Sequence, residues 1–393
     1  MNKKIFITLS IIALTGNLFF TNCQAEMTKK DKKLNSYIIA AKTSIQDKQY
    51  TNAIEYYNKA ISLNSKMSDL YVQRGSAKYL KGDYKGAVAD YTKALEIEPN
   101  KENVYYNRGI AKSYLKAYDE VISDYTKELE INDKNKNAYL NRGTAEVLLN
   151  KYDEAISDFT KLIEIDNNNE QGYYNRGLAK RNKGDYDGAI EDYTKVLEIN
   201  PDNTEARNNR GAAKYYLKDY QGAIEDYTKV INAGKNLKKT YHNRGLAYLM
   251  LKKYENSIED FTKAIKYNPQ NDLAYYDRGI AFEFTGNTKA ALEDYSEAIK
   301  INPKNADYYS NRGALLSKTN KDLKQAQNDL DIAIKLDPDD TDKYLTRAII
   351  YCKQELYLAA IDDLNILLKI DQTNIHAKEL RSYAIKSMMS IQQ

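Results

Sequence analysis

A five-residue phrase that recurs every 34 residues constrains this chain more than any other feature. It reads YVQRG at 71–75, YYNRG at 105–109 and 173–177, and YLNRG at 139–143, and it returns as YHNRG, YYDRG and YSNRG further on. A period of this length is typical of arrays in which small similar units stack along one axis. The 393 residues are therefore expected to form one array rather than several globular domains.

Residues 170–203 show what one repeat contains. Apolar or small residues fall at helical spacings in two segments, with Lys-Gly-Asp-Tyr at 183–186 between them. Gly184 is suited to end the first helix and Asp185 to cap the second, while Pro201 cannot continue a helix interior. The repeat is thus predicted to hold two helices of about a dozen residues, here named helix A and helix B. A single hairpin cannot bury its apolar faces, so neighbouring repeats must stack on it.

With residues numbered 1 to 34 in each repeat, the pattern resembles that of the tetratricopeptide repeat (TPR) family, in a bacterial form marked by Asn-Arg-Gly. Tyrosine stands at position 4 in nine repeats, with Arg207 in the sixth, and all five prolines stand at position 32. The resemblance implies an all-α fold, a right-handed α-solenoid or superhelix of ten repeats, with a C-terminal capping helix at 375–393. The predicted repeats are 34–67, 68–101, 102–135, 136–169, 170–203, 204–237, 238–271, 272–305, 306–340 and 341–374.

The arginine at position 7 shares a helix face with the tyrosine and the glycine of the phrase, so its charge is predicted to need an acidic partner. Aspartate recurs at position 23, and the first repeat lacks both residues, having Ala40 and Tyr56 instead. This joint absence predicts structural pairs inside each repeat. The predicted pairs are Arg74 with Asp90, Arg108 with Asp124, Arg142 with Asp158, Arg176 with Asp192, Arg210 with Asp226, Arg244 with Asp260, Arg278 with Asp294, Arg312 with Asp329 and Arg347 with Asp363.

Position 6 points about 200° away from position 4 on helix A and is predicted to face away from the core. In the TPR family that face lines the concave groove, and side-chain amides there suit the backbone of an extended peptide. The predicted partner-binding ladder is Gln73, Asn107, Asn141, Asn175, Asn209, Asn243, Asp277 and Asn311, with flat contacts from Tyr106, Tyr174, His242 and Tyr276 at position 5. The alternative is that these asparagines are solvated surface residues copied by repeat duplication.

The N-terminus is predicted to be a signal peptide over residues 1–25. Lys3 and Lys4 precede an apolar run at 5–20, and Cys23 and Ala25 place small residues before a cleavage point. The alternatives are a lipoprotein signal over 1–22, with lipidation of Cys23, and an uncleaved anchor. A short charged linker is expected at 26–33. The array is therefore predicted to be extracytoplasmic, either periplasmic or secreted, or else a membrane-anchored lipoprotein.

Composition and motifs argue against several function classes. The formal net charge is +4, and Lys3 and Lys4 supply two of these charges, which argues against a nucleic-acid partner and leaves a lipid anchor at Cys23 as the one membrane contact. The sequence has no phosphate-binding loop, zinc-protease motif or cysteine cluster. The acidic run at 337–342 is predicted to be a capped turn, because it lacks the glycine and distal glutamate of a calcium loop. The chain is predicted to be non-enzymatic, with no cofactor and no metal.

Together these patterns predict an exported TPR scaffold that binds protein or peptide partners of unknown identity along its concave groove. The predicted mechanism is multivalent, with several repeats each contributing modestly. The alternative function is a structural or assembly component of a cell-envelope complex that docks through the convex face or the ends of the array.

Overall fold

The computed structural model describes residues 28–391, and within that range the ordered structure is helical, with no strand. The predicted signal peptide and Cys23 lie outside the described residues. The chain divides into two compact units, Met1–Ala206 and Arg207–Gln393. The all-α fold predicted from the sequence is confirmed.

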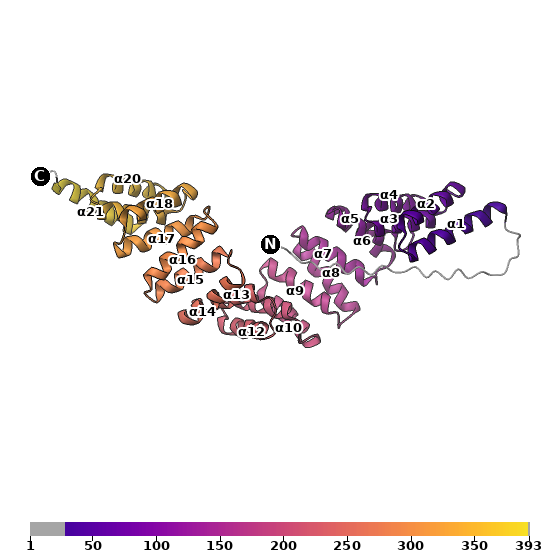
Figure 1. The fold of residues 1–393 in the computed structure, drawn as a ribbon, viewed down its shortest axis with the longest axis horizontal. Coiled ribbons are helices and arrows are strands. Elements are labelled where there is room, and N and C mark those ends of the chain that lie inside the picture. Colours follow the sequence, from indigo (N-terminus) through magenta and orange to yellow (C-terminus); the bar gives the residue numbers. More distant parts are fainter. Residues whose placement is uncertain (1–27, 392–393) are drawn as a thin grey trace. The chain divides into compact units, whose positions relative to one another are not determined.

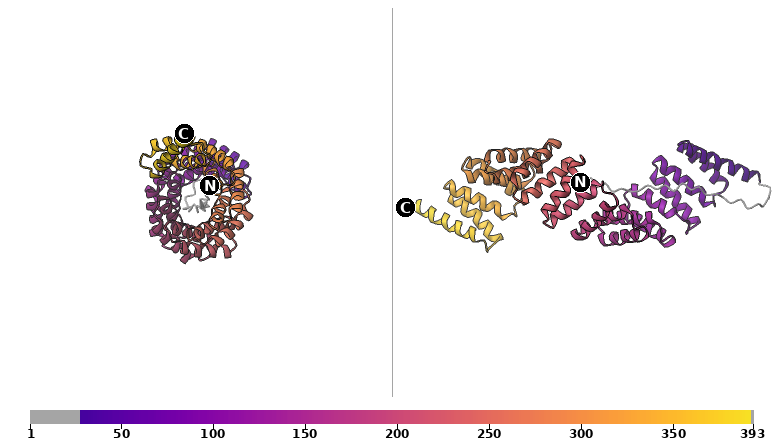
Figure 2. Two further views of the ribbon diagram at one scale, coloured as in Figure 1. Left: turned by 90° about the vertical axis from the view of Figure 1, so that its left-hand side faces the viewer. Right: turned by 90° about the horizontal axis from the view of Figure 1, so that it is seen from below.

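Each unit is a series of helix hairpins stacked in chain order (Figures 1 and 2). The first unit holds α1 (Lys29–Gln46), α2 (Tyr50–Leu63), α3 (Ser68–Lys81), α4 (Tyr84–Ile97), α5 (Val104–Tyr114), α6 (Tyr118–Ile131), α7 (Lys136–Leu148), α8 (Tyr152–Ile165), α9 (Glu170–Lys183) and α10 (Tyr186–Ile199). Helix α11 (Thr204–Tyr216) begins in the first unit and continues into the second. The second unit holds α12 (Tyr220–Asn232), α13 (Leu237–Met250), α14 (Tyr254–Tyr267), α15 (Asp272–Phe284), α16 (Thr288–Ile301), α17 (Ala306–Thr319), α18 (Leu323–Leu336), α19 (Thr341–Lys353), α20 (Tyr357–Ile370) and α21 (Ile375–Ile391).

The hairpin turns follow the local signals in the sequence. Helix α9 ends at Gly184, whose φ of 97° is left-handed, and Asp185 caps α10 by accepting a hydrogen bond from the Gly188 N–H at 3.0 Å. Where the turn lacks glycine, another residue adopts the left-handed conformation, such as Lys48 with φ 58° or Asn150 with φ 60°. Such residues tolerate this region less well than glycine, so the stacking of the flanking helices must hold them there.

The charged linker predicted at 26–33 is only partly a linker, because α1 already begins at Lys29. Thr28 accepts a hydrogen bond from the Asp31 N–H, and the Asp31 carboxylate accepts one from the Thr28 N–H, each at 3.2 Å. This reciprocal capping box gives α1 a defined start five residues before the predicted first repeat.

The core lies between helices A and B of each repeat. Position 20 carries a small residue and position 24 a large apolar one, and members such as Ala189 and Tyr193 have no exposed surface. The position-8 glycine lets the helices approach: a Cβ built on Gly279 would lie 2.7 Å from Cε1 of Tyr295. The recurring five-residue motif therefore serves mainly in packing, because its glycine leaves room for the aromatic ring of helix B.

Candidate partner-binding surface

The position-7 arginines each join two helices of one repeat. Every one of them donates from Nε and Nη2 to both carboxylate oxygens of the aspartate predicted as its partner, over 2.6–3.0 Å. The arginine side chains are 13–19% exposed and the aspartates 0–7%. Two parallel hydrogen bonds in such a sheltered place are the stronger kind of ion pair. Each arginine and its aspartate bond to one another within the fold, so these pairs have a structural role.

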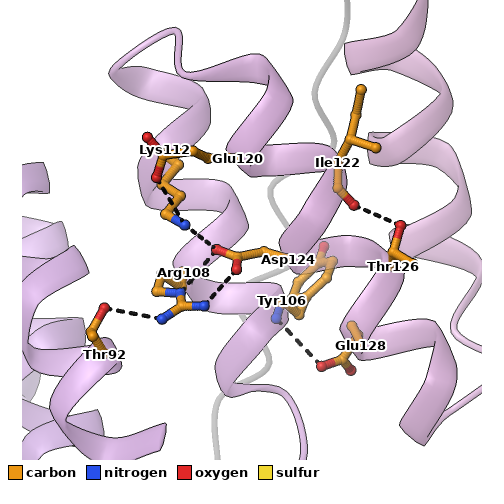
Figure 3. A network of polar contacts seen from close by, with 9 residues as sticks. All are labelled: Thr92, Tyr106, Arg108, Lys112, Glu120, Ile122, Asp124, Thr126 and Glu128. Atoms are coloured by element: carbon orange, nitrogen blue, oxygen red, sulfur yellow. Dashed lines mark hydrogen bonds and ion pairs between the residues drawn. The ribbon is translucent and has the colours of Figure 1, made fainter. Parts of the chain in front are cut away.

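A second bond of the same arginines, which sequence reasoning missed, reaches the preceding repeat. Figure 3 shows Arg108 between Asp124 of its own repeat and Thr92 of the repeat before, whose Oγ1 accepts from Nη1 at 3.0 Å. The equivalent acceptors are Asn58 for Arg74, Thr126 for Arg142, Thr160 for Arg176, Thr228 for Arg244, Thr262 for Arg278, Ser296 for Arg312 and Asp331 for Arg347, at 2.6–3.1 Å. The signal was present in the sequence as the recurring Tyr-Thr-Lys at positions 24–26. The arginine therefore joins three helices and two repeats.

Position 11 changes the electrostatics of this cluster from repeat to repeat. Lysines there contact the position-23 aspartate, as Lys112 contacts Asp124 at 3.0 Å and Lys214 contacts Asp226 at 2.9 Å. Burial by itself would raise the pKa of Asp226, but hydrogen bonds from Arg210 and Lys214 outweigh it and hold that pKa below the usual value. Three aspartates whose repeats lack this lysine behave differently: burial outweighs the arginine and raises the pKa of Asp158, Asp260 and Asp294.

The ladder predicted at position 6 is less exposed than predicted. Asn141 is 5% exposed and Asn175 is 7% exposed, and the other members are half-buried. The reason is that helices A of successive repeats, such as α7 and α9, touch one another. The prediction considered one helix alone, and so it did not include the helix A of the next repeat.

Several predicted contact residues are bonded to each other between repeats. Asn141 Nδ2 donates to the Tyr106 hydroxyl at 3.3 Å, Asn311 Nδ2 donates to the Tyr276 hydroxyl at 2.9 Å, and His242 Nε2 lies 2.7 Å from an oxygen of Asp277. Each pair links position 5 of one repeat with position 6 of the next. These side chains hold neighbouring helices A together.

Tyr106 was predicted to offer a flat contact to a partner, and the structure contradicts this. Its side chain is 1% exposed, and its ring packs 5.7 Å from that of Tyr125. Burial raises the pKa of Tyr106 to about 12. The ring is part of the core because the next repeat covers it. Tyr174 keeps partial exposure beside Tyr193, and the Asn209 side chain is also half-buried.

Other members of the ladder retain unused hydrogen-bonding groups. Gln73, Asn107 and Asn243 are half-buried, and their side-chain amides form no hydrogen bond with any residue in the range 28–391. Each amide offers two donors and one acceptor oxygen. A half-buried amide without a protein partner gains most from a ligand that supplies one.

Several repeats carry a large apolar side chain at position 13, which lies on the same helix face as position 6, since seven residues are close to two turns. Tyr114 is 42% exposed, Met250 is 49% exposed and Phe284 is 63% exposed. The Tyr114 ring stacks on Tyr84 at 4.4 Å, and the Phe284 ring stacks on Tyr254 at 5.0 Å. Positions 6 and 13 of the helices A together are named the A-face below. The sequence analysis did not identify these apolar residues.

Two carboxylates of the acidic run at 337–342 bind a lysine side chain of the same chain. Lys343, with no exposed surface, donates from Nζ to Asp337 and Asp340 at 2.6 Å each, and Asp340 caps α19 by accepting from the Asp342 N–H. Among residues 28–391 no group of three metal-binding side chains comes together. In the same range, no helix has both the length and the apolar character needed to span a bilayer.

Comparison with known proteins agrees with the stacked hairpins. Tetratricopeptide repeat models match residues 34–67, 171–203 and 239–271, and a further TPR repeat model matches 75–113, 143–181 and 285–320. The chain contains tetratricopeptide repeats. No curated protein matches this TPR chain in sequence.

Solved structures that match this chain include other TPR proteins. A tetratricopeptide repeat protein from Parabacteroides merdae ATCC 43184 is 19% identical, with 64% of this chain and 99% of that chain covered and a TM-score of 0.47. YrrB, described as a TPR protein with an unusual peptide-binding site, is 25% identical, with 46% and 93% covered and a TM-score of 0.42. A chain of the APC/C hetero-tetramer Cut9–Hcn1 is 13% identical, with 91% of this chain and 96% of that chain covered and a TM-score of 0.46.

Proposed function

We propose that this TPR chain is an exported, non-enzymatic scaffold that binds protein or peptide partners along its A-face. The observation that carries the proposal is the set of open amides at Gln73, Asn107 and Asn243, which form no hydrogen bond within residues 28–391. Their donors and acceptors match those of an extended peptide backbone, which repeats along its length as the array does. Such contacts read backbone more than side chains, so selectivity would be modest.

The apolar row at position 13 supplies the second part of the surface. Tyr114, Met250 and Phe284 have exposed apolar area, and burying such area on binding is favourable. A partner that fits both rows has an extended backbone with scattered large apolar side chains. Each repeat contributes little, and affinity accumulates over several repeats.

Export and the absence of catalysis complete the proposal. The predicted signal at 1–25, or the lipoprotein signal that ends before Cys23, would place the array outside the cytoplasm. The intact mass of the protein isolated from its cell envelope distinguishes cleavage after Ala25 from acylation of Cys23, and an uncleaved cytoplasmic protein would overturn export. The nearly balanced charge favours proteins over nucleic acids as partners.

Binding through the A-face is tested by a matched pair of triple variants. One carries Gln73→Ala, Asn107→Ala and Asn243→Ala, and the control carries Asn52→Ala, Gln221→Ala and Asn256→Ala at exposed sites on helices B. Peptides are selected from a random library on the wild-type array and titrated against all three proteins, with melting curves to show that each is folded. The proposal expects binding to be lost from the first variant alone. Equal binding by all three would exclude the open amides as the site.

A further inference from the structure

Helix α21 is built like the helix A of a further repeat (Figure 1). Its Arg381, Ser382 and Ala384 stand at the spacing of arginine, glycine and alanine in the repeats, as in Arg-Gly-Leu-Ala at 176–179. Ala377 and Ala384 have no exposed surface and belong to one apolar cluster with residues of α20. Helix α21 therefore docks on the preceding helix B as the other helices A do.

The opposite side of α21, where a helix B would pack, is uncovered. Position 8 is buried in all ten repeats, at Ala41, Gly75, Gly109, Gly143, Gly177, Gly211, Gly245, Gly279, Gly313 and Ala348. The equivalent Ser382 is exposed. Seven residues to either side on the same face, Ile375 is 68% exposed and Met389 is 56% exposed. Within residues 28–391 no helix lies against this open face, defined by Ile375, Ser382 and Met389.

Arg381 lacks the carboxylate that every other arginine of the pattern holds. Its Nε is shielded from solvent and has no hydrogen-bond partner, and no ion pair joins its guanidinium to any residue between 28 and 391. In the tenth repeat, by contrast, Arg347 Nε donates to Asp363 at 2.8 Å. A sheltered N–H without an acceptor costs free energy, which a carboxylate placed over the open face would recover.

We propose that the open face of α21 binds a helix of a partner protein, with an acidic side chain on Arg381 and a large apolar side chain over Ser382. The repeats of this chain show which helix fits: a small residue, an aspartate three positions later, then a large apolar residue, as in Ala189, Asp192 and Tyr193. The partner helix would continue the interface that already joins helices A and B. This site lies on α21, the last helix of the described residues, and is separate from the A-face.

The probe is a fluorescent, helix-stapled peptide with the sequence of residues 185–200, which contains α10 and its cap, titrated with the full-length chain. Binding is expected for the wild type, with a loss of about tenfold or more on Arg381→Ala, and a similar loss when the peptide carries Asp192→Asn. Ser382→Trp should also remove binding while leaving the melting temperature unchanged, because that side chain is exposed. The control Lys386→Ala, at an exposed site of α21, should bind as the wild type does.

The strongest test exchanges the two charges of the proposed ion pair between the chain and the peptide. Arg381→Asp should lose the wild-type peptide and recover a peptide that carries Asp192→Arg. Equal binding by all variants, or no binding by the wild type, would overturn the proposal. Sedimentation of the unliganded chain tests whether a second copy binds the open face instead. A dimer that disappears with Arg381→Ala and with Ser382→Trp would show that it does, and would overturn the proposal.

Discussion

Glu146 on α7 stands beside Asp158 on α8, at the position from which Lys112 pairs with Asp124 one repeat earlier. Glu146 is 5% exposed, and one of its side-chain oxygens has no hydrogen-bond partner within residues 28–391. Burial, and then the charge of Asp158, raise the pKa of Glu146 to about 7. The fourth repeat thus carries an acid where a cation would neutralise the cluster.

The raised pKa predicts a stability that falls with pH. The folded state holds the Glu146 proton up to about pH 7, whereas the unfolded chain releases it near its ordinary value of 4.5. The destabilising contribution therefore grows between these two values and is complete above the higher one. Glu146→Gln should raise the free energy of unfolding by about 2–3 kcal/mol at pH 8 and by much less at pH 5. Urea titrations at both pH values measure this, and a gain independent of pH would contradict the assignment.

The buried pair of Arg278 and Asp294 is expected to be strongly coupled. Its hydrogen bonds measure 2.7 and 2.8 Å, and the Asp294 side chain is 7% exposed and contacts no lysine of the described range 28–391. Asp294→Ala or Arg278→Ala should each cost about 3 kcal/mol, because each leaves a sheltered charge unpaired. The double variant should cost clearly less than the sum of the two. A double-mutant cycle from urea unfolding measures this coupling.

The control for this cycle is Lys195 with Glu198, which are 2.7 Å apart but each 56% exposed. Solvent and salt screen such a pair, so its coupling should be close to zero. Equal coupling for the two pairs would show that burial is not what makes the position-7 arginines important.

The bond from Arg176 to Thr160 is expected to stabilise the contact between two repeats. Nη1 of Arg176 lies 3.1 Å from Thr160 Oγ1, and that hydroxyl itself donates to the Ile156 carbonyl. Thr160→Val keeps the shape and removes the acceptor, so it should cost about 1 kcal/mol, while Thr160→Ser should cost less. Thr43→Val, at an exposed site of α1, is the control. If Thr160→Val unfolds at the same urea concentration as the wild type, the bond between repeats contributes nothing.

The sequence was sufficient to predict the helix hairpins, because each one is determined by local signals that recur. Gly184 and Asp185 mark the turn between helices A and B, and Pro201 marks the end of helix B. The same local signals recur along the chain, so no long-range contact is needed to place the helices. The pairing of Arg347 with Asp363 also follows from counting, since both residues recur in the same repeats.

The candidate site was harder to predict because it depends on neighbouring repeats. The rotation of position 6 about its own helix does not reveal that the next helix A covers Asn141, or that Tyr106 becomes core. The raised pKa of Glu146 likewise needs the distance to another helix. The bond between Arg176 and Thr160 also joins two repeats, so it does not follow from the pattern inside one repeat.

The buried Lys343 is expected to be the cation of the acidic turn at 337–342. Its Nζ lies 2.6 Å from both Asp337 and Asp340, which removes the two carboxylates that a calcium ion would need. Burial alone would lower the pKa of Lys343, but the hydrogen bonds to the two aspartates outweigh it and raise that pKa. The stabilisation is therefore fully present at neutral pH and is lost only when the pH rises above the ordinary lysine range.

Lys343→Gln should accordingly lower the free energy of unfolding by about 2–3 kcal/mol, because it leaves two acids beside a buried neutral group. Lys335→Gln, at an exposed site of α18, should change it little. Adding millimolar calcium to the wild type should leave the melting temperature unchanged. A calcium-dependent rise would mean that the ion displaces Lys343, and the turn would then be a metal site after all.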